Sequence, residues 1–426
     1  MKKTIVVVEC YSSSVNYIHD IRKLGYEPIL LELYSPQIDM TKIRAINDKA
    51  YAFIEEPIPQ ILQAEKTYEK TLKMISKLSP VLILAGADTG LELSLKLSSD
   101  LKLKSNPLSI FLNLRDKFMM QEILKNSGLR YIKSCIIRSV EEAVNLYRNE
   151  FGKKVVIKPT QSAASKNVFV CGSEAEVKNA FCINEQFIKQ RNKKEEKIIM
   201  QEYIDGQEYA VDTISCESTH AALFGMKYKK RICKGFGKIY DTDFYFSPDD
   251  IAMKELVDYC FKVLSCLGIQ YGCVHSEFII DEKGPVLIEV NARPAGAFQK
   301  YTFQDKVMEN HETAVSLESY FMDKKHFFER YPERMHLKQP AVVKQICLEK
   351  DIYVKKVKIK ERLSSLKSFE YVLDKGDNCI YSKTVDLDTN GGMIYLTAPK
   401  YEIIERDLQE ILALEKEGLD EFYDRY

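Results

Sequence analysis

Short apolar runs alternate with amphipathic stretches along the N-terminal quarter of the chain. The runs at 4–8, 28–33 and 81–85 have the length and the apolar content of buried strands. A helical pattern that ends at Gly25 follows the first run, and another begins at Leu91 after the third. Strands that alternate with helices in this way predict a parallel sheet with helices on its faces.

The middle of the chain has a different pattern. A helix is predicted to begin at Arg115 and to stop before Gly128. Strands and helices then alternate to about Tyr203, and the region 198–310 is rich in strand patterns, with one long helix near 249–267.

The last 110 residues have a pattern of their own, which predicts a separate small α+β unit. Turn residues at 388–392 lie between two apolar runs, 384–387 and 393–396, as in a β-hairpin. Apolar residues at helical spacing between 404 and 412 predict an amphipathic helix. The pattern as a whole predicts a multidomain fold of the α/β and α+β classes, and 426 residues suggest about three domains.

Composition and charge add exclusions to this picture. The chain has 62 Lys+Arg and 62 Asp+Glu, whereas a general nucleic-acid binder needs a basic surplus. No stretch approaches the roughly 20 apolar residues of a membrane span, and the apolar run after Lys3 is too short for a signal peptide. The 11 cysteines are scattered without a CxxC pair, which is typical of a reducing compartment. We therefore expect a cytoplasmic protein without nucleic-acid or membrane partners.

The strongest chemical signal is a predicted β-hairpin near residue 283. Counting outward from its turn places Glu277 opposite Glu289, and Ile279 opposite Leu287. Directly opposed residues have Cβ atoms about 4.5–5.5 Å apart, and two carboxylates that close repel one another in apolar surroundings. A bound divalent cation would remove that repulsion.

Further polar residues share this face of the hairpin. Asn291 and Arg293 are on the side of Glu289, because side chains alternate along a strand. Carboxylates with an amide oxygen suit Mg²⁺ that is shared with phosphate oxygens, and an arginine suits an anionic transition state. Two alternatives stay open at this point: a glutamate pair that shares a proton, and an edge hairpin that faces water.

Two upstream segments add polar groups. Lys158 ends an apolar strand, and a loop of small polar residues at 160–167 follows it. The backbone N–H groups of such a flap can bind phosphates, although a lysine at a strand end more often reaches into solvent. The strand 198–204 leaves through an Asp-Gly turn, whose backbone could face a purine while Glu208 accepts from a ribose. The alternative is a plain β-turn between two strands.

Three other segments carry candidate side chains. Asp88 follows a strand at a helix N-terminus, where it either stabilises the helix dipole or binds a substrate ammonium. His275 precedes Glu277 by two residues and is either a hydrogen-bonded core histidine or a substrate contact. The segment from Lys234 to Phe244 is either a substrate-facing loop or an exposed connection.

Taken in order, these segments resemble the ATP-grasp superfamily of carboxylate–amine ligases, and within it the L-amino acid ligase (dipeptide-forming) branch most of all. The resemblance covers almost the whole chain. Its most specific motif is Ile-Glu-Val-Asn-Ala-Arg-Pro-Ala-Gly at 288–296, and 86–90, 115–118, 158–171 and 386–397 carry the rest.

The resemblance implies an ATP-grasp fold in three parts. An N-terminal parallel-sheet (pre-ATP-grasp) domain would span 1–112, and the ATP-grasp domain 113–310, with a lid at about 130–202. A C-terminal α+β domain would span 311–426.

The resemblance also implies a role for each matching residue. Lys117 and Lys158 would bind the α- and β-phosphates, the 202–204 backbone the adenine, and Glu208 the ribose. The residues implied to bind ATP are Lys117, Lys158, Ser162, Ser165, Glu202, Tyr203, Ile204 and Glu208. The implied ligands of Mg²⁺, or of Mn²⁺ in its place, are Glu277, Glu289 and Asn291. Arg293 would be catalytic, and the substrates would contact Asp88, His275 and Gly296.

The flap departs from the family's usual glycine-rich Ser-Ala-Gly-Ser-Asp-Gly. Ala164 and Asn167 replace its glycines, and Lys166 stands at the acidic position. Asparagine tolerates a left-handed backbone, so Asn167 is the milder change of the two glycine positions.

The implied activity is an ATP-dependent ligase. A small-molecule carboxylate, expected to be an amino acid, attacks the γ-phosphate to give an acyl phosphate and ADP, and an amine then displaces phosphate to form an amide. Dimers are common in such relatives, so a homodimer is one option for this chain, and the sequence leaves the oligomeric state open. The alternatives are a catalytically inactive or regulatory Mg-ATP-binding module and an ATP-grasp carboxylase.

Overall fold

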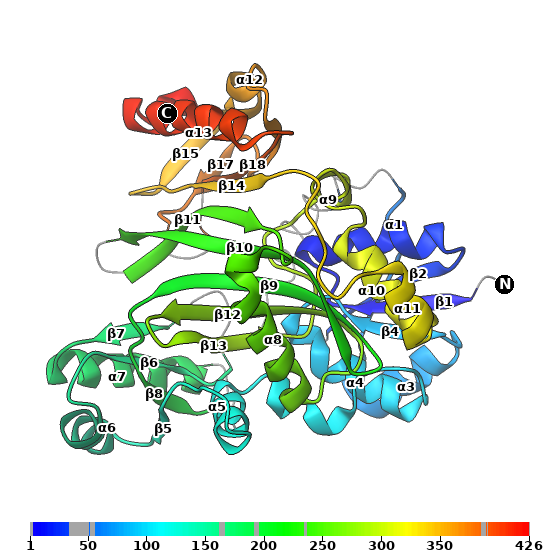
Figure 1. The fold of residues 1–426 in the computed structure, drawn as a ribbon, viewed down its shortest axis with the longest axis horizontal. Coiled ribbons are helices and arrows are strands. Elements are labelled where there is room, and N and C mark those ends of the chain that lie inside the picture. Colours follow the sequence, from blue (N-terminus) through cyan, green and yellow to red (C-terminus); the bar gives the residue numbers. More distant parts are fainter. Residues whose placement is uncertain are drawn as a thin grey trace.

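A computed structural model describes most of the chain, and Figure 1 shows its course from the N-terminal to the C-terminal elements. The described residues are 3–33, 51, 56–161, 167–190, 196–233, 237–384, 389 and 391–425. The predicted flap residues Ser162 and Ser165, the start of the 234–244 segment, and residues 385–388 and 390 of the predicted 384–396 hairpin lie outside these ranges.

The N-terminal part is a parallel sheet with helices packed on it. Its four strands have the order β3-β2-β1-β4, and every neighbouring pair is parallel. Its strands are β1 (Thr4–Val8), β2 (Glu27–Glu32), β3 (Gln60–Gln63) and β4 (Leu82–Ala85), and its helices are α1 (Asn16–Lys23), α3 (Tyr68–Ser76) and α4 (Leu91–Asp100). The three strands predicted here, and the two helices that follow them, are confirmed.

A small four-stranded antiparallel sheet lies beside the centre of the molecule, at the lower left of Figure 1. It has the order β5-β8-β6-β7 and is formed by residues from the segment 130–202, for which the sequence predicts a lid. Its elements are β5 (Ser134–Ile137), α6 (Val140–Leu146), β6 (Val155–Pro159), β7 (Phe169–Cys171), α7 (Glu174–Gln190) and β8 (Ile198–Glu202). Helix α5 (Lys117–Asn126) precedes it in the chain.

The centre of the molecule is an eight-stranded antiparallel sheet in the order β13-β12-β9-β10-β11-β14-β18-β16. Its strands are β9 (Gln207–Cys216), β10 (Thr219–Cys233), β11 (Gly237–Phe246), β12 (Gly272–Asp281), β13 (Gly284–Asn291), β14 (Ala341–Ile346), β16 (Phe369–Leu373) and β18 (Gly392–Thr397). Helix α8 (Lys254–Leu267) crosses the front of this sheet in Figure 1, where the sequence predicts one long helix.

The remaining elements connect and cover this sheet. They are α9 (Tyr301–Val307), α10 (Glu312–Phe321), α11 (Lys324–Arg330), β15 (Ile352–Val357), α12 (Ile359–Leu363), β17 (Cys379–Tyr381), α13 (Tyr401–Glu417) and β19 (Tyr423–Arg425). Helix α13 is the predicted amphipathic helix, and buries Ile404, Leu408 and Ile411. Strands β14, β16 and β18 extend the central sheet, so the boundary at 310/311 stays a prediction.

Each face of the central sheet has its own apolar core. On the α8 side, Val274 and Phe278 of β12 pack with Leu287 and Val290 of β13. On the other side, Cys273 of β12 belongs to a core that reaches the N-terminal sheet and β14. His275 and Glu277 of the candidate site share the face of Cys273 on β12, the second strand from one edge of the sheet.

The β12–β13 hairpin corrects one detail of the predicted register. Glu277 pairs with Glu289 as expected, but Ile279 pairs with Val286 and not with Leu287. A β-bulge after Glu277 accounts for the difference, because it inserts one extra residue, Ile288, into β13. The bulge turns Leu287 into the α8-side core, whereas strict alternation would have put it on the face of Glu289.

A second correction concerns the segment that was expected to be a substrate-facing loop or an exposed connection. Its residues from 237 onward form β11, an inner strand that pairs with β10 on one side and β14 on the other. Asp241 and Asp243 are therefore buried within a sheet.

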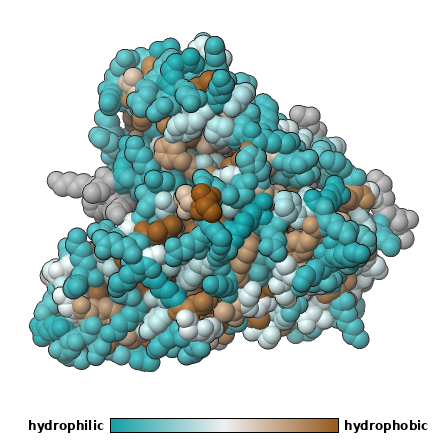
Figure 2. All heavy atoms as spheres, in the orientation of Figure 1, coloured by the Kyte–Doolittle hydropathy of each residue, from teal (hydrophilic) through white to brown (hydrophobic). Residues whose placement is uncertain are grey.

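The outer surface is mostly hydrophilic in the view of Figure 2, where apolar side chains form small separate groups. Among the described residues, no helix is both long and apolar enough to cross a membrane. The described cysteines are free thiols, and Cys10, Cys171, Cys216, Cys260 and Cys273 are buried.

Candidate active site

The two opposed glutamates come from neighbouring strands at the edge of the central sheet. Glu277 and Glu289 are register partners, and their side chains are 18% and 15% exposed. Lys117 Nζ lies 2.6 Å from Glu289 Oε2. Burial would raise the pKa of Glu289, but the charge and hydrogen bond of Lys117, helped by Lys158, lower it to about 2. Glu289 is therefore an ionised carboxylate at neutral pH.

Lys117 is held in this position by the start of helix α5. Asp116 caps the helix: its carboxylate accepts hydrogen bonds from the backbone N–H groups of Phe118 (2.9 Å) and Met119 (3.0 Å). The backbone N–H of Lys117 donates to the carbonyl of Thr160, at 3.0 Å, at the first residue of the flap. The cap and this bond fix the lysine between the lid and the hairpin.

A second lysine is buried nearby. Lys158 lies in β6, is only 5% exposed, and is close enough to Lys117 and Glu289 for their charges to act on it. Burial and the charge of Lys117 lower the pKa of Lys158 to about 8. Two lysines that disfavour one another's charge in a buried position are well suited to a bound polyanion, because an anion would stabilise both.

Asn291 and Arg293 continue the same face beyond Glu289. The amide Nδ2 of Asn291 donates to Glu289 Oε1 at 3.3 Å, which leaves the amide oxygen for another partner. Arg293 Nε donates to Asp88 Oδ2 at 3.1 Å, and Arg115 Nη1 lies 3.4 Å from Asp88 Oδ1. Asp88 therefore sits between two arginines at the end of β4, and is already engaged by cations of this chain.

Gly296 lies close to this group. A Cβ atom added to Gly296 would meet only Arg293 Nη1, at 4.0 Å, so the backbone here does not require glycine for space. The predicted substrate candidates Asp88 and Gly296 thus both lie next to Arg293.

His275 lies in a buried polar chain beneath the metal candidates. Its Nδ1 is 2.9 Å from Asp212 Oδ1, and its Nε2 is 3.5 Å from Glu277 Oε1 and 3.4 Å from the Tyr228 hydroxyl. Burial opposes the charged imidazole, but the charge and hydrogen bond of Asp212 and the bond to Glu277 raise the pKa of His275 to about 10. This geometry favours the core-histidine interpretation, in which His275 orients Glu277.

The connector between β8 and β9 runs close to the hairpin. Gly206 is required for this approach, because an added Cβ would lie 2.4 Å from the carbonyl oxygen of Ile280. Glu202 Oε1 accepts a hydrogen bond from the backbone N–H of Lys133 at 2.8 Å, so this side chain holds the segment before β5 against the end of β8. Ile204 and Tyr203 are half-buried along the connector.

Glu208 is the second residue of β9, the strand that follows the connector, and already has a partner. It forms an ion pair with Lys230, whose Nζ also lies 4.2 Å from the ring centroid of Tyr240. A ribose that bound to Glu208 would share the carboxylate with this lysine.

At the end of the flap, Asn167 has a φ of 58°, in the left-handed region. The sequence argument expected asparagine to tolerate such a backbone where the family has glycine, and this position is consistent with it.

Three residues of the site were not singled out from the sequence as functional. Arg115 was noted only as part of a motif, and Asp212 and Glu312 were not considered. Both oxygens of Glu312 accept from the backbone N–H of Ala295, at 3.2 and 3.1 Å. Burial and the charge of Asp212 raise the pKa of Glu312 to about 8. The sequence does contain one signal for Asp212: an acidic residue inside an apolar run, Tyr-Ala-Val-Asp-Thr-Ile at 209–214, indicates a buried carboxylate.

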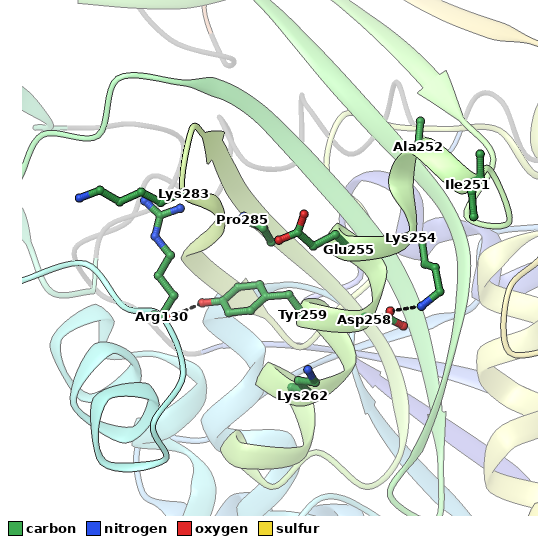
Figure 3. A pocket seen from close by; sticks show the side chains of 10 residues that line it. All are labelled: Arg130, Ile251, Ala252, Lys254, Glu255, Asp258, Tyr259, Lys262, Lys283 and Pro285. Atoms are coloured by element: carbon green, nitrogen blue, oxygen red, sulfur yellow. Dashed lines mark hydrogen bonds and ion pairs between the residues drawn. The ribbon is translucent and has the colours of Figure 1, made fainter.

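Two surface pockets lie away from these residues. The larger, of about 580 Å³, lies between α8 and the hairpin turn, and Figure 3 shows Arg130, Lys283 and Glu255 around it. Arg130 is already engaged there, since it donates to Asp281 Oδ2 at 2.6 Å. The smaller pocket lies on the lid. The candidate site is therefore defined by its side chains and not by either pocket.

Comparison with known proteins adds a family to this geometry. Residues 151–300 match the family described as the ATP-grasp domain. The chain is 27% identical to dapdiamide A synthase of Enterobacter agglomerans over 309 residues, 71% of this chain and 70% of the relative. It is 26% identical to a D-alanine–D-alanine ligase of Fusobacterium nucleatum subsp. nucleatum over 214 residues, 46% of this chain and 66% of the relative.

A solved structure resembles the chain over nearly its whole length. The crystal structure of L-amino acid ligase from Bacillus licheniformis has a TM-score of 0.74 at 15% identity, and the match covers 96% of this chain and 97% of that one. At that identity the likeness shows a shared fold.

Proposed function

The chain has an ATP-grasp fold, and on that premise we propose that it is an ATP-dependent carboxylate–amine ligase that joins an amino acid to an amine. The curated relatives with which it shares sequence are a dapdiamide synthase and D-alanine–D-alanine ligases. The observation that carries the proposal is the pair Glu277–Glu289, with two buried lysines and Arg293 close enough for their charges to act on it.

The donor set fits a divalent cation. It has two carboxylates, Glu277 and Glu289, and the amide oxygen of Asn291. So few protein ligands leave several positions for phosphate oxygens and water, which is how Mg²⁺ binds in nucleotide sites. Glu277, Glu289 and Asn291 would hold Mg²⁺, or Mn²⁺, and the ion would supply charge neutralisation for the phosphates.

The chain's own residues would position the nucleotide. Lys117 and Lys158 would contact the α- and β-phosphates, and bound phosphate would replace part of the contact between Lys117 and Glu289. The backbone from Glu202 to Ile204 would hold the adenine and Glu208 the ribose. The flap residues Ser162 and Ser165 would close over the phosphates through their N–H groups.

The reaction needs positioning and charge stabilisation more than proton transfer. The substrate carboxylate oxygen attacks the γ-phosphorus, and ADP leaves with the bridging oxygen. Arg293, fixed by Asp88, would stabilise the transferring phosphoryl group and then the acyl phosphate. The neutral amine then attacks the acyl carbon, phosphate leaves, and the nitrogen loses its proton to form the amide.

The substrates are small molecules, and we propose that the enzyme acts as a homodimer in the cytoplasm. The family resemblance supports the dimer, and the scattered free thiols support a reducing compartment. Size-exclusion chromatography with light scattering tests the dimer, and a monomer mass would contradict it.

The activity is tested by mixing the protein with ATP, Mg²⁺ and pairs of amino acids, with ADP release and amide products as readouts. Amide formation with one ADP per bond is the expected result. Binding of Mg·ATP without turnover on any pair would favour the inactive or regulatory alternative. The reason for considering that alternative is Ala164, which stands in the flap where the family has glycine. Incorporation of labelled bicarbonate without amide would favour the carboxylase alternative.

A further inference from the structure

Two arginines share one carboxylate at the end of β4. Arg293 Nε donates to Asp88 Oδ2 at 3.1 Å, and Arg115 Nη1 lies 3.4 Å from Asp88 Oδ1. The two guanidinium groups bring two positive charges, and Asp88 balances only one of them. The group therefore keeps an excess of positive charge, which a bound anion would neutralise.

The shared carboxylate is held by the end of the N-terminal sheet. Asp88 lies in the turn between β4 and α4, with Gly86 and Gly90 on either side of it. A Cβ atom added to Gly86 or Gly90 would lie 2.6 or 2.5 Å from a backbone oxygen at or just after the end of β1, so the turn packs directly against that strand. Asp88 therefore has a fixed position from which it orients both guanidinium groups.

Arg115 has its hydrogen-bonding capacity unused. A guanidinium has five N–H donors in a planar fork. In the part of the chain that the structure describes, the Arg115 side chain donates no hydrogen bond: its contact with Asp88 is an ion pair, and Oδ1 of Asp88 has no hydrogen-bond partner. The Arg115 side chain is 12% exposed, so a ligand that enters the site can reach it. A carboxylate fits such a fork with two parallel hydrogen bonds.

Arg115 lies two residues before Lys117 in the chain, but it contacts a different part of the site. Lys117 contacts Glu289, where the metal and the phosphates are proposed to bind, whereas Arg115 contacts Asp88. Through Asp88 it is joined to Arg293, the proposed partner of the acyl phosphate. A group bound to Arg115 would therefore lie close to the acyl carbon. An α-amino acid carries its amine and its carboxylate on one carbon, which suits this short separation.

We propose that Arg115 binds the carboxylate of the amine substrate, so that the enzyme selects an amino acid over an amine that has no carboxylate. This inference rests on the proposed function, because that function places the acyl phosphate at Arg293. The neutral amine attacks the acyl carbon, a C–N bond forms, the C–O bond to phosphate breaks, and phosphate leaves with the electron pair. The nitrogen then loses its proton to solvent. The carboxylate at Arg115 takes no part in these bonds, and the product keeps it.

The test compares amines with and without a carboxylate. Hydroxylamine converts an acyl phosphate to a hydroxamate, so it reports the first half-reaction without the proposed contact. With ATP, Mg²⁺ and a carboxylate substrate that supports hydroxamate formation, the amine probes are glycine, L-alanine and L-leucine, each paired with its own carboxamide. At equal concentrations of neutral amine, the wild-type KM for at least one amino acid should be at least about tenfold below that for its carboxamide, the effect of one charge-assisted contact.

Arg115→Met should remove this preference. Its KM for the amino acid should rise by about tenfold or more, whereas its KM for the carboxamide, its KM for ATP and its rate of hydroxamate formation should stay within about twofold of the wild type. Arg115→Lys keeps the charge but loses the planar fork, and should recover part of the preference. Arg362→Met removes an ion-paired, exposed guanidinium from α12 and is the matched control, which should keep the full preference.

Other outcomes overturn the inference. No preference in the wild type, or an unchanged preference in Arg115→Met, contradicts the role of this arginine, and so does a rise in the KM for ATP in place of the KM for the amino acid. If Arg115→Met does not fold, Arg115→Lys replaces it, and an unchanged preference in that variant overturns the inference. Hydroxamate formation without a carboxylate preference overturns this inference alone, whereas neither hydroxamate nor amide with any substrate overturns the proposed function as well.

Discussion

Lys117 decides the charge state of the carboxylate on which the proposed chemistry depends. The 2.6 Å contact keeps Glu289 ionised despite its burial, and the same lysine depresses the pKa of Lys158. The site is thus arranged so that a polyphosphate and a divalent cation would each relieve an existing imbalance: the cation between the glutamates, the phosphates between the lysines.

Glu289→Gln should abolish turnover while the protein stays folded. The amide keeps the shape but loses the charge that faces Lys117 and the cation, so ADP release should fall by at least about a hundredfold, the scale of one lost transition-state contact. Glu282→Gln, in the exposed turn of the same hairpin, is the matched control and should retain activity. Wild-type-like turnover of Glu289→Gln would remove the metal assignment.

The lowered pKa of Lys158 predicts a pH effect on nucleotide binding. Above pH 8 the free protein loses the Lys158 proton, whereas bound phosphate favours the charged lysine. Mg·ATP affinity should therefore fall as the pH rises above 8, and binding at pH 9 should take up a proton. Calorimetry in buffers of different ionisation enthalpy measures this uptake. Equal proton uptake by Lys158→Met would show that another group is responsible.

The sequence was most informative where residues lie close together in the chain. The pairing of Glu277 with Glu289 follows from counting across one tight turn, and the structure has it as predicted. The contacts of Asp88 with Arg115 and Arg293 could not be predicted, because they join residues up to 205 positions apart. Asp243 was included in a candidate substrate segment, but as part of a loop, since its polar neighbours hid the strand pattern.

At the scale of elements, the β8–β9 connector depends on one glycine. Gly206 lets the connector approach the backbone of Ile280 in β12, and this brings the backbone proposed to hold adenine to the hairpin. The bulge in β13 is a second local feature that changes where side chains lie. One extra residue there interrupts the alternation of side chains between the two faces of the sheet, and no residue type in the hairpin predicts it.

Gly206→Ala should weaken ATP binding without unfolding the protein. The added Cβ would lie 2.4 Å from the Ile280 carbonyl, so the connector must move. The KM for ATP should rise by roughly tenfold or more, because displacements of about 1 Å near a site have large effects. Gly172→Ala, where the nearest atom to an added Cβ is 3.7 Å away, is the control. An unchanged KM in Gly206→Ala would contradict the proposed adenine position.

The N-terminal sheet is joined to the rest of the molecule through buried polar contacts. His311, at the start of α10, lies 2.7 Å from Asp20 of α1 through Nε2 and 2.8 Å from Asp305 through Nδ1. Asp20 also accepts from the Thr313 hydroxyl at 2.6 Å. Burial opposes the charged imidazole, but the hydrogen bonds of Asp20 and Asp305 outweigh it and raise the pKa of His311 to about 9.

This contact should make the stability of the whole molecule depend on pH. A folded-state pKa above the unfolded value of 6.5 means that the contribution is complete below pH 6.5 and is lost as the pH rises through 9. At about 1.4 kcal/mol per pKa unit, it is of the order of 3 kcal/mol. The melting temperature of the wild type should therefore fall more between pH 6.5 and 9 than that of His311→Gln.

The exposed His336 provides the control for that experiment, and His336→Gln should follow the wild-type pH profile. The pKa of His275 is also raised, so His275 contributes a pH dependence in the same direction. The difference between the wild-type and His311→Gln profiles isolates the contribution of His311. Identical slopes for wild type and His311→Gln would show that the protonation of His311 adds nothing to stability.

The continuity of the central sheet has a consequence for how the chain is made. Thr242, Asp243 and Phe244 pair with residues 342–344, about a hundred positions later, so β11 has an open edge until that later segment is synthesised and docks. Exposed edges of this kind recruit other chains. A fragment cut at residue 310 would keep that edge permanently, and we expect it to aggregate on expression, while a chain that continues through β18 stays monodisperse.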